Sequence, residues 1–182
     1  MDRVTAKNER PILIVARIRN PKQITIGGGH GAGKGRNGES GVHSNMTNTM
    51  NTPVEVAERE YHIFFTSYKI RKNSGGTGAW KGGDGIIRSF MAKEACAISV
   101  LADRFVNPPY ALAGGKSGKT GMVYITHVGK KRRYPSKFTA DLAPGDEVII
   151  FTPGGSGYGK KRKTNPEHGA NNKSKADNDM QR

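Results

Sequence analysis

The chain has 182 residues, enough for one ordinary domain and marginal for two, and a low fraction of them, 34%, is hydrophobic. Its formal net charge of +15 favours polyanionic partners, and its single cysteine excludes a disulfide framework within the chain. No charged start followed by an apolar stretch indicates a signal peptide, and no apolar run approaches membrane-spanning length. We therefore expect a soluble, cytoplasmic protein.

Short apolar runs alternate with glycine, proline and asparagine along most of the chain. These runs are rich in β-branched and aromatic residues, and runs of this kind between turn residues are typical of strands. The pattern predicts a mainly β fold, α+β at most, with short strands joined by glycine-rich loops. Strands are expected at residues 11–19, 61–70, 85–91, 95–103, 122–128, 137–142 and 146–153.

One short helix is expected near residues 53–60. Thr52 is a suitable cap, Pro53 suits the first helical position, and Glu55 completes a capping box. Residues 104–121 hold adjacent prolines and several glycines, which exclude regular structure there.

Basic residues concentrate in two blocks. Residues 160–182 hold seven basic and three acidic side chains and almost nothing apolar, which predicts a disordered basic tail. Residues 130–133 (KKRR) stand beside a glycine and a proline and are expected in a hairpin loop. Each block is either solvated or in contact with a polyanion, and the lack of interleaved aromatic residues weakens a base-stacking role. The resulting domain organisation is a loose N-terminus at 1–10, a domain at 11–159 and the tail.

Two single-copy residues are expected to have packing roles. Cys96 lies in an apolar run, which indicates a buried, inert thiol. Trp80 stands among glycines in the stretch 74–85. Neither position indicates chemistry.

Residues 28–35 read GGHGAGKG, one residue away from a phosphate-binding loop. Gly33 and Lys34 fit that motif, but Gly35 stands where a magnesium-binding hydroxyl is needed. No helix signal follows, although loop amides and a helix N-terminus together bind the phosphates. The stretch is therefore interpreted as a glycine turn that brings the backbone close to a neighbour or a substrate.

Four blocks follow one another in the chain. They are GGGHGAGKGRNGESGVHSNMTNTMNTPVE at 27–55, SGGTGAWKGGDGIIR at 74–88, LADRFVNPPYALAGGKSGKTG at 101–121 and PSKFTADLAPGDEVIIFTPGGSGYG at 135–159. In this order they resemble the C-terminal part of the hydantoinase B/oxoprolinase family, whose members are much longer.

In that family one subunit or domain uses ATP to phosphorylate a ring amide or enol oxygen, and the B part completes hydrolysis or carboxylation. The resemblance implies a C-terminal-type B subunit or fragment of an ATP-dependent cyclic amide hydrolase of the hydantoinase/5-oxoprolinase type. It implies ATP used by a partner subunit and not bound here, and any metal held by the partner rather than by this chain. The implied partners are a hydantoinase A-like subunit, a chain supplying the N-terminal B region and a small cyclic amide.

Two residues are the catalytic candidates. His43 lies among amides and hydroxyls, as a general base or ligand or as a loop histidine bonded to the backbone. Arg88 follows a glycine loop and an apolar pair, and either points toward an anion or lies on the surface. Where the family has a second histidine, this chain has Asn45, a departure that bears on proton transfer and metal binding.

The substrate-binding candidates are glycine amides, a cation, and hydroxyl, amide and charged side chains. They are Gly29, Gly31, Lys34, Thr47, Asn48, Asn51, Asp103 and Arg104. The hydroxyls and amides have a second interpretation as partners of the backbone, and the Asp-Arg pair as a plain turn. Lys34 stands where the family often has proline and would suit a phosphorylated intermediate. His30 is a second choice to His43 as a catalytic histidine.

The sequence has no paired-histidine, CxxC or GxSxG motif, and so no self-sufficient catalytic set. Two other functions therefore stay open. One is a non-catalytic structural remnant of the family. The other is a basic protein that binds nucleic acid through its tail, for which affinity would fall steeply with salt.

Overall fold

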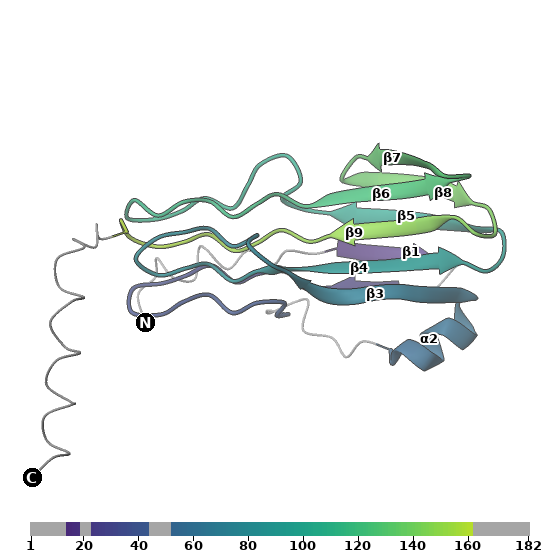
Figure 1. The fold of residues 1–182 in the computed structure, drawn as a ribbon, viewed down its shortest axis with the longest axis horizontal. Coiled ribbons are helices and arrows are strands. Elements are labelled where there is room, and N and C mark those ends of the chain that lie inside the picture. The colour runs from purple at the N-terminus through teal and green to yellow at the C-terminus, as the bar shows by residue number, and fades with distance from the viewer. Residues whose placement is uncertain (1–13, 19–22, 44–51, 162–182) are drawn as a thin grey trace, which may run out of the picture.

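The computed structural model describes residues 14–18, 23–43 and 52–161, and consists of two antiparallel sheets packed face to face (Figure 1). The first sheet has the order β2-β1-β5-β8, formed by Ile14–Ile18 (β1), Gln23–Ile26 (β2), Cys96–Ala102 (β5) and Lys137–Leu142 (β8). The second has the order β3-β4-β9-β6-β7, formed by Ile63–Arg71 (β3), Gly85–Ala92 (β4), Met122–His127 (β6), Lys130–Tyr134 (β7) and Glu147–Phe151 (β9). A helix, α2 (Val54–Glu60), lies beside β3.

The hydrophobic core lies between the two sheets. Ile98 and Val100 of β5 and Val148 and Ile150 of β9 are fully buried, whereas Ile149 is partly exposed. This alternation is that of strands with one face on a core. The prediction of a mainly β fold with one short helix near 53–60 is confirmed.

Long extended segments project from one end of this sandwich and pack side by side, with only isolated β-bridges between them (Figure 1). They comprise residues 27–43, 74–85, 112–121 and 152–160, and we call them the glycine bundle. The sequence predicts these stretches as loops and turns. They are instead ordered by one another, because each satisfies its backbone groups on its neighbours.

The innermost part of the bundle is residues 153–159. Gly155 N donates to Gly83 O at 2.8 Å, and Gly155 O accepts from Gly76 N at 2.8 Å. Gly29 N donates to the oxygen of Pro153, and Gly157 N to that of Lys116. One short segment thus holds three others, and its residues from Pro153 to Gly157 are all buried.

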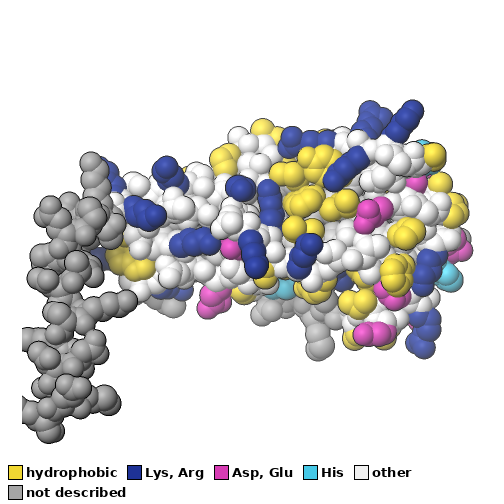
Figure 2. All heavy atoms as spheres, in the orientation of Figure 1, with side chains coloured by type: hydrophobic (Ala, Val, Ile, Leu, Met, Phe, Trp, Pro, Cys, Tyr) yellow, Lys and Arg dark blue, Asp and Glu magenta, His cyan; other side chains and the backbone are white. Residues whose placement is uncertain are grey.

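Side chains are excluded from this interior by geometry. A Cβ added to Gly155 would lie closer than 3.0 Å to the oxygen of His30, one on Gly83 to that of Glu39, and one on Gly29 to that of Gly83. Only glycine permits such an approach of backbones, as at the axis of the collagen triple helix. The bundle therefore presents mostly small residues and backbone at its surface, with Lys and Arg side chains standing out from it (Figure 2).

Two strands differ from the sequence prediction. Residues 23–26 form β2, which the sequence does not predict because the run is short and merges with glycines. The basic block 130–133, expected in a hairpin loop, is part of strand β7, and the turn is the preceding Val128-Gly129. All four of these basic side chains are exposed on an edge strand, where charge opposes pairing with another chain.

The predicted capping box is wrong. The residue that caps α2 is Pro53, with no side-chain hydrogen bond to the helix end, and Thr52 Oγ1 lies 3.1 Å from the hydroxyl of Tyr61 instead. Cys96 packs against the core but is only partly buried, so the expectation of a buried thiol holds in part. The N-terminus 1–10 and residues 162–182 of the predicted tail lie outside the described residues.

Substitution Gly155→Ala is expected to lower the free energy of unfolding by about 3 kcal/mol, because the added methyl meets a fixed carbonyl oxygen. The control is Gly129→Ala in the β6–β7 turn, where no atom lies within 4 Å and only the positive φ opposes alanine, at about 1 kcal/mol. Urea unfolding followed by the fluorescence of Trp80, which contacts Tyr158 in the bundle, measures both. Equal losses in the two variants would contradict the packing argument.

The backbone of the β6–β7 turn is strained at Val128, and a substitution there is expected to relieve the strain. Val128 has φ 45° and Gly129 φ 74°, so a β-branched residue adopts a left-handed conformation that favours asparagine or glycine. Val128 is 86% exposed, so its side chain contributes little packing. Val128→Asn is therefore expected to raise the free energy of unfolding by about 1 kcal/mol in urea titrations. Val128→Ala, which keeps an ordinary Cβ at the same φ, should gain much less.

Candidate functional site

Arg88 is buried on β4, the strand next to the edge of the second sheet. It lies on β4 directly opposite Tyr68 of the edge strand β3, and only 3% of it is exposed. Its guanidinium carbon lies 4.5 Å from the ring centroid of Phe65 and 5.0 Å from that of Tyr68. Of the two interpretations that the sequence left open, the surface arginine does not match this position.

The guanidinium of Arg88 makes no hydrogen bond with the described residues, and its Nε is fully buried. Burial lowers the pKa of Arg88, an effect that the phenol groups of Tyr68 and Tyr61 oppose. A buried charge with no hydrogen-bond partner is destabilising, because the water it loses is not replaced. The aromatic contacts offset part of this loss at about 0.5–2 kcal/mol each.

Arg71 shows how the same fold satisfies a comparable side chain. It also lies over an aromatic ring, 5.5 Å from the centroid of Phe151. Its Nη1 donates to the oxygen of Thr120 at 2.8 Å and to that of Thr152 at 3.0 Å. Arg71 thus ties β3 to the base of the bundle, whereas the Nε of Arg88 has no hydrogen-bond partner among the described residues.

Phenol groups lie near Arg88, and one carboxylate bonds to the strand beside it. The hydroxyl of Tyr61, near enough to influence the pKa of Arg88, interacts with Thr52 Oγ1. Glu58 of α2 is close to the same strand, but its Oε1 accepts a 2.7 Å hydrogen bond from the amide of Phe65. The nearby carboxylate is therefore engaged with the backbone.

His43 lies at the same side of the sandwich as Arg88. Gly41, two residues before it, packs against Ile70 and Ile86. These two isoleucines pair with each other, two residues along β3 and β4 from the Tyr68–Arg88 pair. The backbone of His43 also approaches Gly27 at the end of β2. Thr47, Asn48 and Asn51 lie outside the described residues, so their roles stay predictions, as does that of His43.

The glycine candidates belong to the bundle. Gly29 is buried against the backbones of Gly83 and Gly155, and the amide of the next residue, His30, donates to the oxygen of Glu39. What the glycine turn approaches is thus the backbone of other segments, and a role of Gly29 or Gly31 in substrate binding stays a prediction. The Nε2 of His30 is buried without a hydrogen-bond partner among the described residues.

Lys34 stands apart from the other candidates. It lies in the turn at which Gly33 and Arg36 exchange two backbone hydrogen bonds, and it is exposed. An exposed lysine at this position either contacts a bound anion or is surrounded by solvent. Its role as a substrate ligand stays a prediction.

Asp103 and Arg104 lie in another place, just after β5. They line a cavity of about 340 Å³ together with Phe105, Asn107 and Ser136. Arg104 has φ 62°, an uncommon conformation for a residue with a side chain, and its oxygen accepts from Gly121 N. The structure does not bring this pair together with Arg88.

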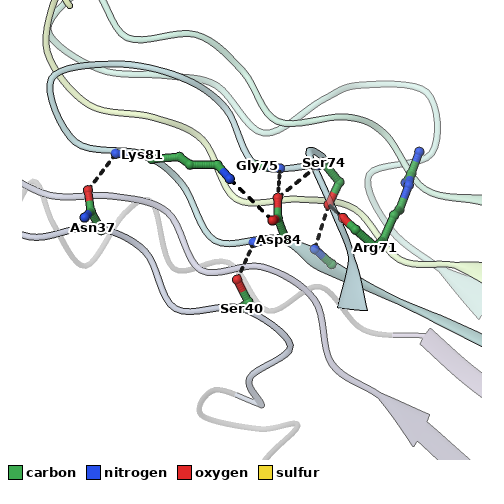
Figure 3. A network of polar contacts seen from close by, with 8 residues as sticks. Asn37, Ser40, Arg71, Ser74, Gly75, Lys81 and Asp84 are labelled. Atoms are coloured by element: carbon green, nitrogen blue, oxygen red, sulfur yellow. Dashed lines mark hydrogen bonds and ion pairs between the residues drawn. The ribbon is translucent and has the colours of Figure 1, made fainter. Parts of the chain in front are cut away.

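The sequence reasoning missed Asp84, the centre of a polar network at the base of the bundle (Figure 3). Its Oδ1 accepts from the amides of Ser74 and Gly75 at 2.9 and 2.7 Å, and its Oδ2 lies 3.4 Å from Lys81 Nζ. Its own amide donates to Ser40 Oγ. An aspartate inside a glycine-rich stretch, ahead of a strand, is the signal that identifies such a residue.

A second pair that the sequence reasoning missed lies at the far end of the sandwich. His127 Nδ1 is 2.7 Å from Asp146 Oδ1, and Asp146 Oδ2 accepts from the amide of Ala143. These residues line an open cavity of about 600 Å³ with Lys130 and Arg132. Asp146 links strand β6 to the turn that precedes β9.

Within residues 14–18, 23–43 and 52–161, no three histidine, cysteine or acidic side chains gather as a metal site. In the same part of the chain, every helix is too short or too polar to cross a bilayer.

A family comparison identifies the chain. The model of hydantoinase B/oxoprolinase matches residues 3–161, most of the sequence. The chain belongs to the hydantoinase B/oxoprolinase family. The resemblance predicted from the four glycine-rich blocks is confirmed, and these blocks supply most of the glycine bundle.

Relatives in the family are far longer than this chain. 5-oxoprolinase 1 of Arabidopsis thaliana is 42% identical over 136 residues, which are 74% of this chain and 11% of that protein. The chain thus spans about a tenth of the length of the first curated relatives it matches.

Two solved structures share the fold. The ATP-dependent caprolactamase from Pseudomonas jessenii has a TM-score of 0.66 at 23% identity, covering 81% of this chain and 28% of that one. A nucleotide-free acetone carboxylase has a TM-score of 0.60 at 15% identity, covering 82% and 25%. Both likenesses show the fold of this part of the family.

The free energy of unfolding is expected to depend on pH through Asp84. Burial raises the pKa of its carboxyl, but the hydrogen bonds from Gly75 and Ser74 and the charge of Lys81 outweigh this and lower the pKa overall. The stabilisation is then present above the unfolded pKa of about 4 and lost as pH falls through the lower folded pKa.

Asp84→Asn is therefore expected to lower the free energy of unfolding by about 1–3 kcal/mol at pH 7, and by less as the pH falls below about 4. Urea titrations across this range measure it, with the exposed Asp141→Asn as control. A loss that is the same at every pH would contradict the role of the charge.

Arg88→Met is expected to raise the free energy of unfolding of the isolated chain by about 1–2 kcal/mol, because an apolar side chain of similar length removes an unpaired buried charge. Arg71→Met should instead lower it by about 1–3 kcal/mol, because two carbonyl oxygens lose their donor. Thermal and urea unfolding of both variants measure the contrast. A destabilised Arg88→Met would mean that Arg88 supports the fold.

Proposed function

We propose that this chain is the C-terminal part of the B portion of an ATP-dependent enzyme that hydrolyses a cyclic amide. The observation that supports this most is its 42% identity to a protein named 5-oxoprolinase, at a coverage of 74% of the chain. The name of the caprolactamase that shares the fold also describes an ATP-dependent enzyme acting on a cyclic amide. Hydrolysis is preferred to carboxylation, because the carboxylase shares only the fold, at 15% identity.

In this proposal the ATP chemistry belongs to other chains. The described residues contain no helix after the GGHGAGKG turn, and so no helix N-terminus for nucleotide phosphates at that point. A hydantoinase A-like subunit would use ATP to phosphorylate the ring amide, and a further chain would supply the remaining B region. This division accords with relatives about ten times the length of the matched segment.

The residues of this chain would contribute at the β3 side of the sandwich. Arg88 supplies a desolvated positive charge, which in a dry site stabilises developing negative charge on the substrate far better than in water. His43, on the same side, is the candidate for proton transfer to the ring nitrogen as the bond to carbon breaks. The glycine bundle is the rigid support that places both.

The test is to isolate the tagged full-length chain from its native cell extract and assay the eluate with ATP, magnesium and 5-oxoproline, hydantoin or caprolactam. We expect a hydantoinase A-like chain in the eluate and ATP-dependent ring opening of at least one compound. His43→Ala should lower kcat by about a hundredfold or more, because it removes a proton-transfer group. The control His62→Ala, at an exposed histidine beside Glu94, should leave kcat unchanged.

Two outcomes would overturn the proposal. A complex with both partner chains and no ring opening would favour a structural remnant of the family. Recovery of RNA without a hydantoinase A-like chain, with binding that is lost steeply as salt rises, would favour a nucleic-acid-binding protein.

A further inference from the structure

The unpaired guanidinium of Arg88 is the feature of the described structure that most needs a partner from outside. An arginine side chain has five N–H donors in one plane. Two aromatic rings, of Phe65 and Tyr68, lie against this guanidinium, and no described acceptor bonds to it. Hydrogen bonds to Arg88 must then come in the plane of the guanidinium, from an acceptor that the described chain does not provide.

The described residues beside β3 have little to offer as the missing anion. The nearby carboxylate, Glu58, is engaged by the amide of Phe65 at 2.7 Å. The stretch that joins His43 to Thr52, residues 44–51 (SNMTNTMN), contains no acidic residue. A counter-charge for Arg88 is therefore expected from another molecule.

We infer that Arg88, together with the hydroxyls of Tyr61 and Tyr68, forms a receiving site for a carboxylate. A carboxylate is planar, carries one charge and accepts two parallel hydrogen bonds from a guanidinium, which matches a single arginine whose guanidinium carbon lies over aromatic rings. A phosphate would call for more positive charge than one arginine supplies. The phenol hydroxyls of Tyr61 and Tyr68, both close enough to influence the pKa of Arg88, add neutral donors beside it.

The approach to this site is apolar. Tyr68 and Ile70 of the edge strand β3, which lie on the same face of the sheet as Arg88, are 55% and 43% exposed. The ring of Tyr68 both contacts the guanidinium of Arg88 and contacts solvent. A ligand that fits carries its carboxylate on an apolar body.

This inference rests on the proposed function in one respect. The carboxylate belongs either to the cyclic amide substrate or to a side chain of the partner that supplies the rest of the B region. Binding of a carboxylate by the chain alone needs neither ATP nor partner, so its outcome is separate from that of the ring-opening assay.

The experiment follows the arginine Nε–Hε signals of the full chain by ¹H–¹⁵N NMR during a sodium acetate titration, with sodium chloride keeping the ionic strength constant. The signal of Arg88, assigned by its loss in Arg88→Met, should shift and saturate. The matched control is Arg71, also stacked on a ring but already bonded to two carbonyl oxygens, whose signal should stay in place. Tyr68→Phe keeps the ring and should weaken acetate binding about fivefold, through the loss of one hydrogen bond.

The two sources of the carboxylate are then separated with the isolated complex. If the partner supplies it, the Arg88→Met chain loses the partner in the pull-down and acetate competes with the wild-type complex. If the substrate supplies it, Arg88→Met keeps the partner and raises KM at least tenfold for a substrate with a carboxylate, but not for one without. The inference is overturned if the Arg88 signal does not move with acetate, or if Arg71 shifts alike.

Discussion

The structure depends on the close approach of backbones in the glycine bundle. Segments 27–33, 74–85 and 112–121 all bond to residues 153–159, and at that separation a Cβ would collide with a carbonyl oxygen. Hydrogen bonding and sterics therefore act together, because several of these bonds form at separations that only glycine permits. The glycine pairs of the sequence mark the places where one segment meets two neighbours.

The bundle continues the strands of the second sheet, so it fixes more than its own segments. Residues 152–160 follow β9, residues 74–85 join β3 to β4, and residues 112–121 precede β6. At this junction Asp84 bonds to the turn after β3 while its own amide bonds to Ser40. Arg88 lies on β4, four residues after Asp84. The hydrogen bonds of Asp84 at the start of β4 therefore help to fix the position of the candidate site.

Sequence patterns predict the β class, the short helix and the family, because each rests on local signals or on ordered motifs. They do not predict the bundle, because nothing in a single glycine run says which distant run it will bond to. Strand β7 was misjudged for a related reason. Four basic residues suggest a loop, whereas pairing with β6 and exposure at a sheet edge decide the outcome.

In the candidate site, too, neighbouring residues in the sequence predict some features, and contacts between distant residues decide the others. The spacing of glycine, apolar pair and arginine places Arg88 on a strand, but burial comes from Phe65 and Tyr68, which lie on the neighbouring strand. The lack of a hydrogen-bond partner is a property of everything around the side chain, and no short motif encodes it. Asp84 and the His127–Asp146 pair escaped notice because their partners are likewise set by tertiary structure.

A buried cation whose Nε has no hydrogen-bond partner among the described residues is uncommon in a protein. The neighbouring Arg71 shows that this sheet can satisfy a stacked guanidinium with two carbonyl oxygens, so the unsatisfied state of Arg88 is not forced by the architecture. Local rules of polar satisfaction are broken mostly at functional sites, where stability is lost in exchange for binding or catalysis. We therefore infer that the unmet hydrogen bond of the Arg88 Nε is available to an anion from outside the described chain.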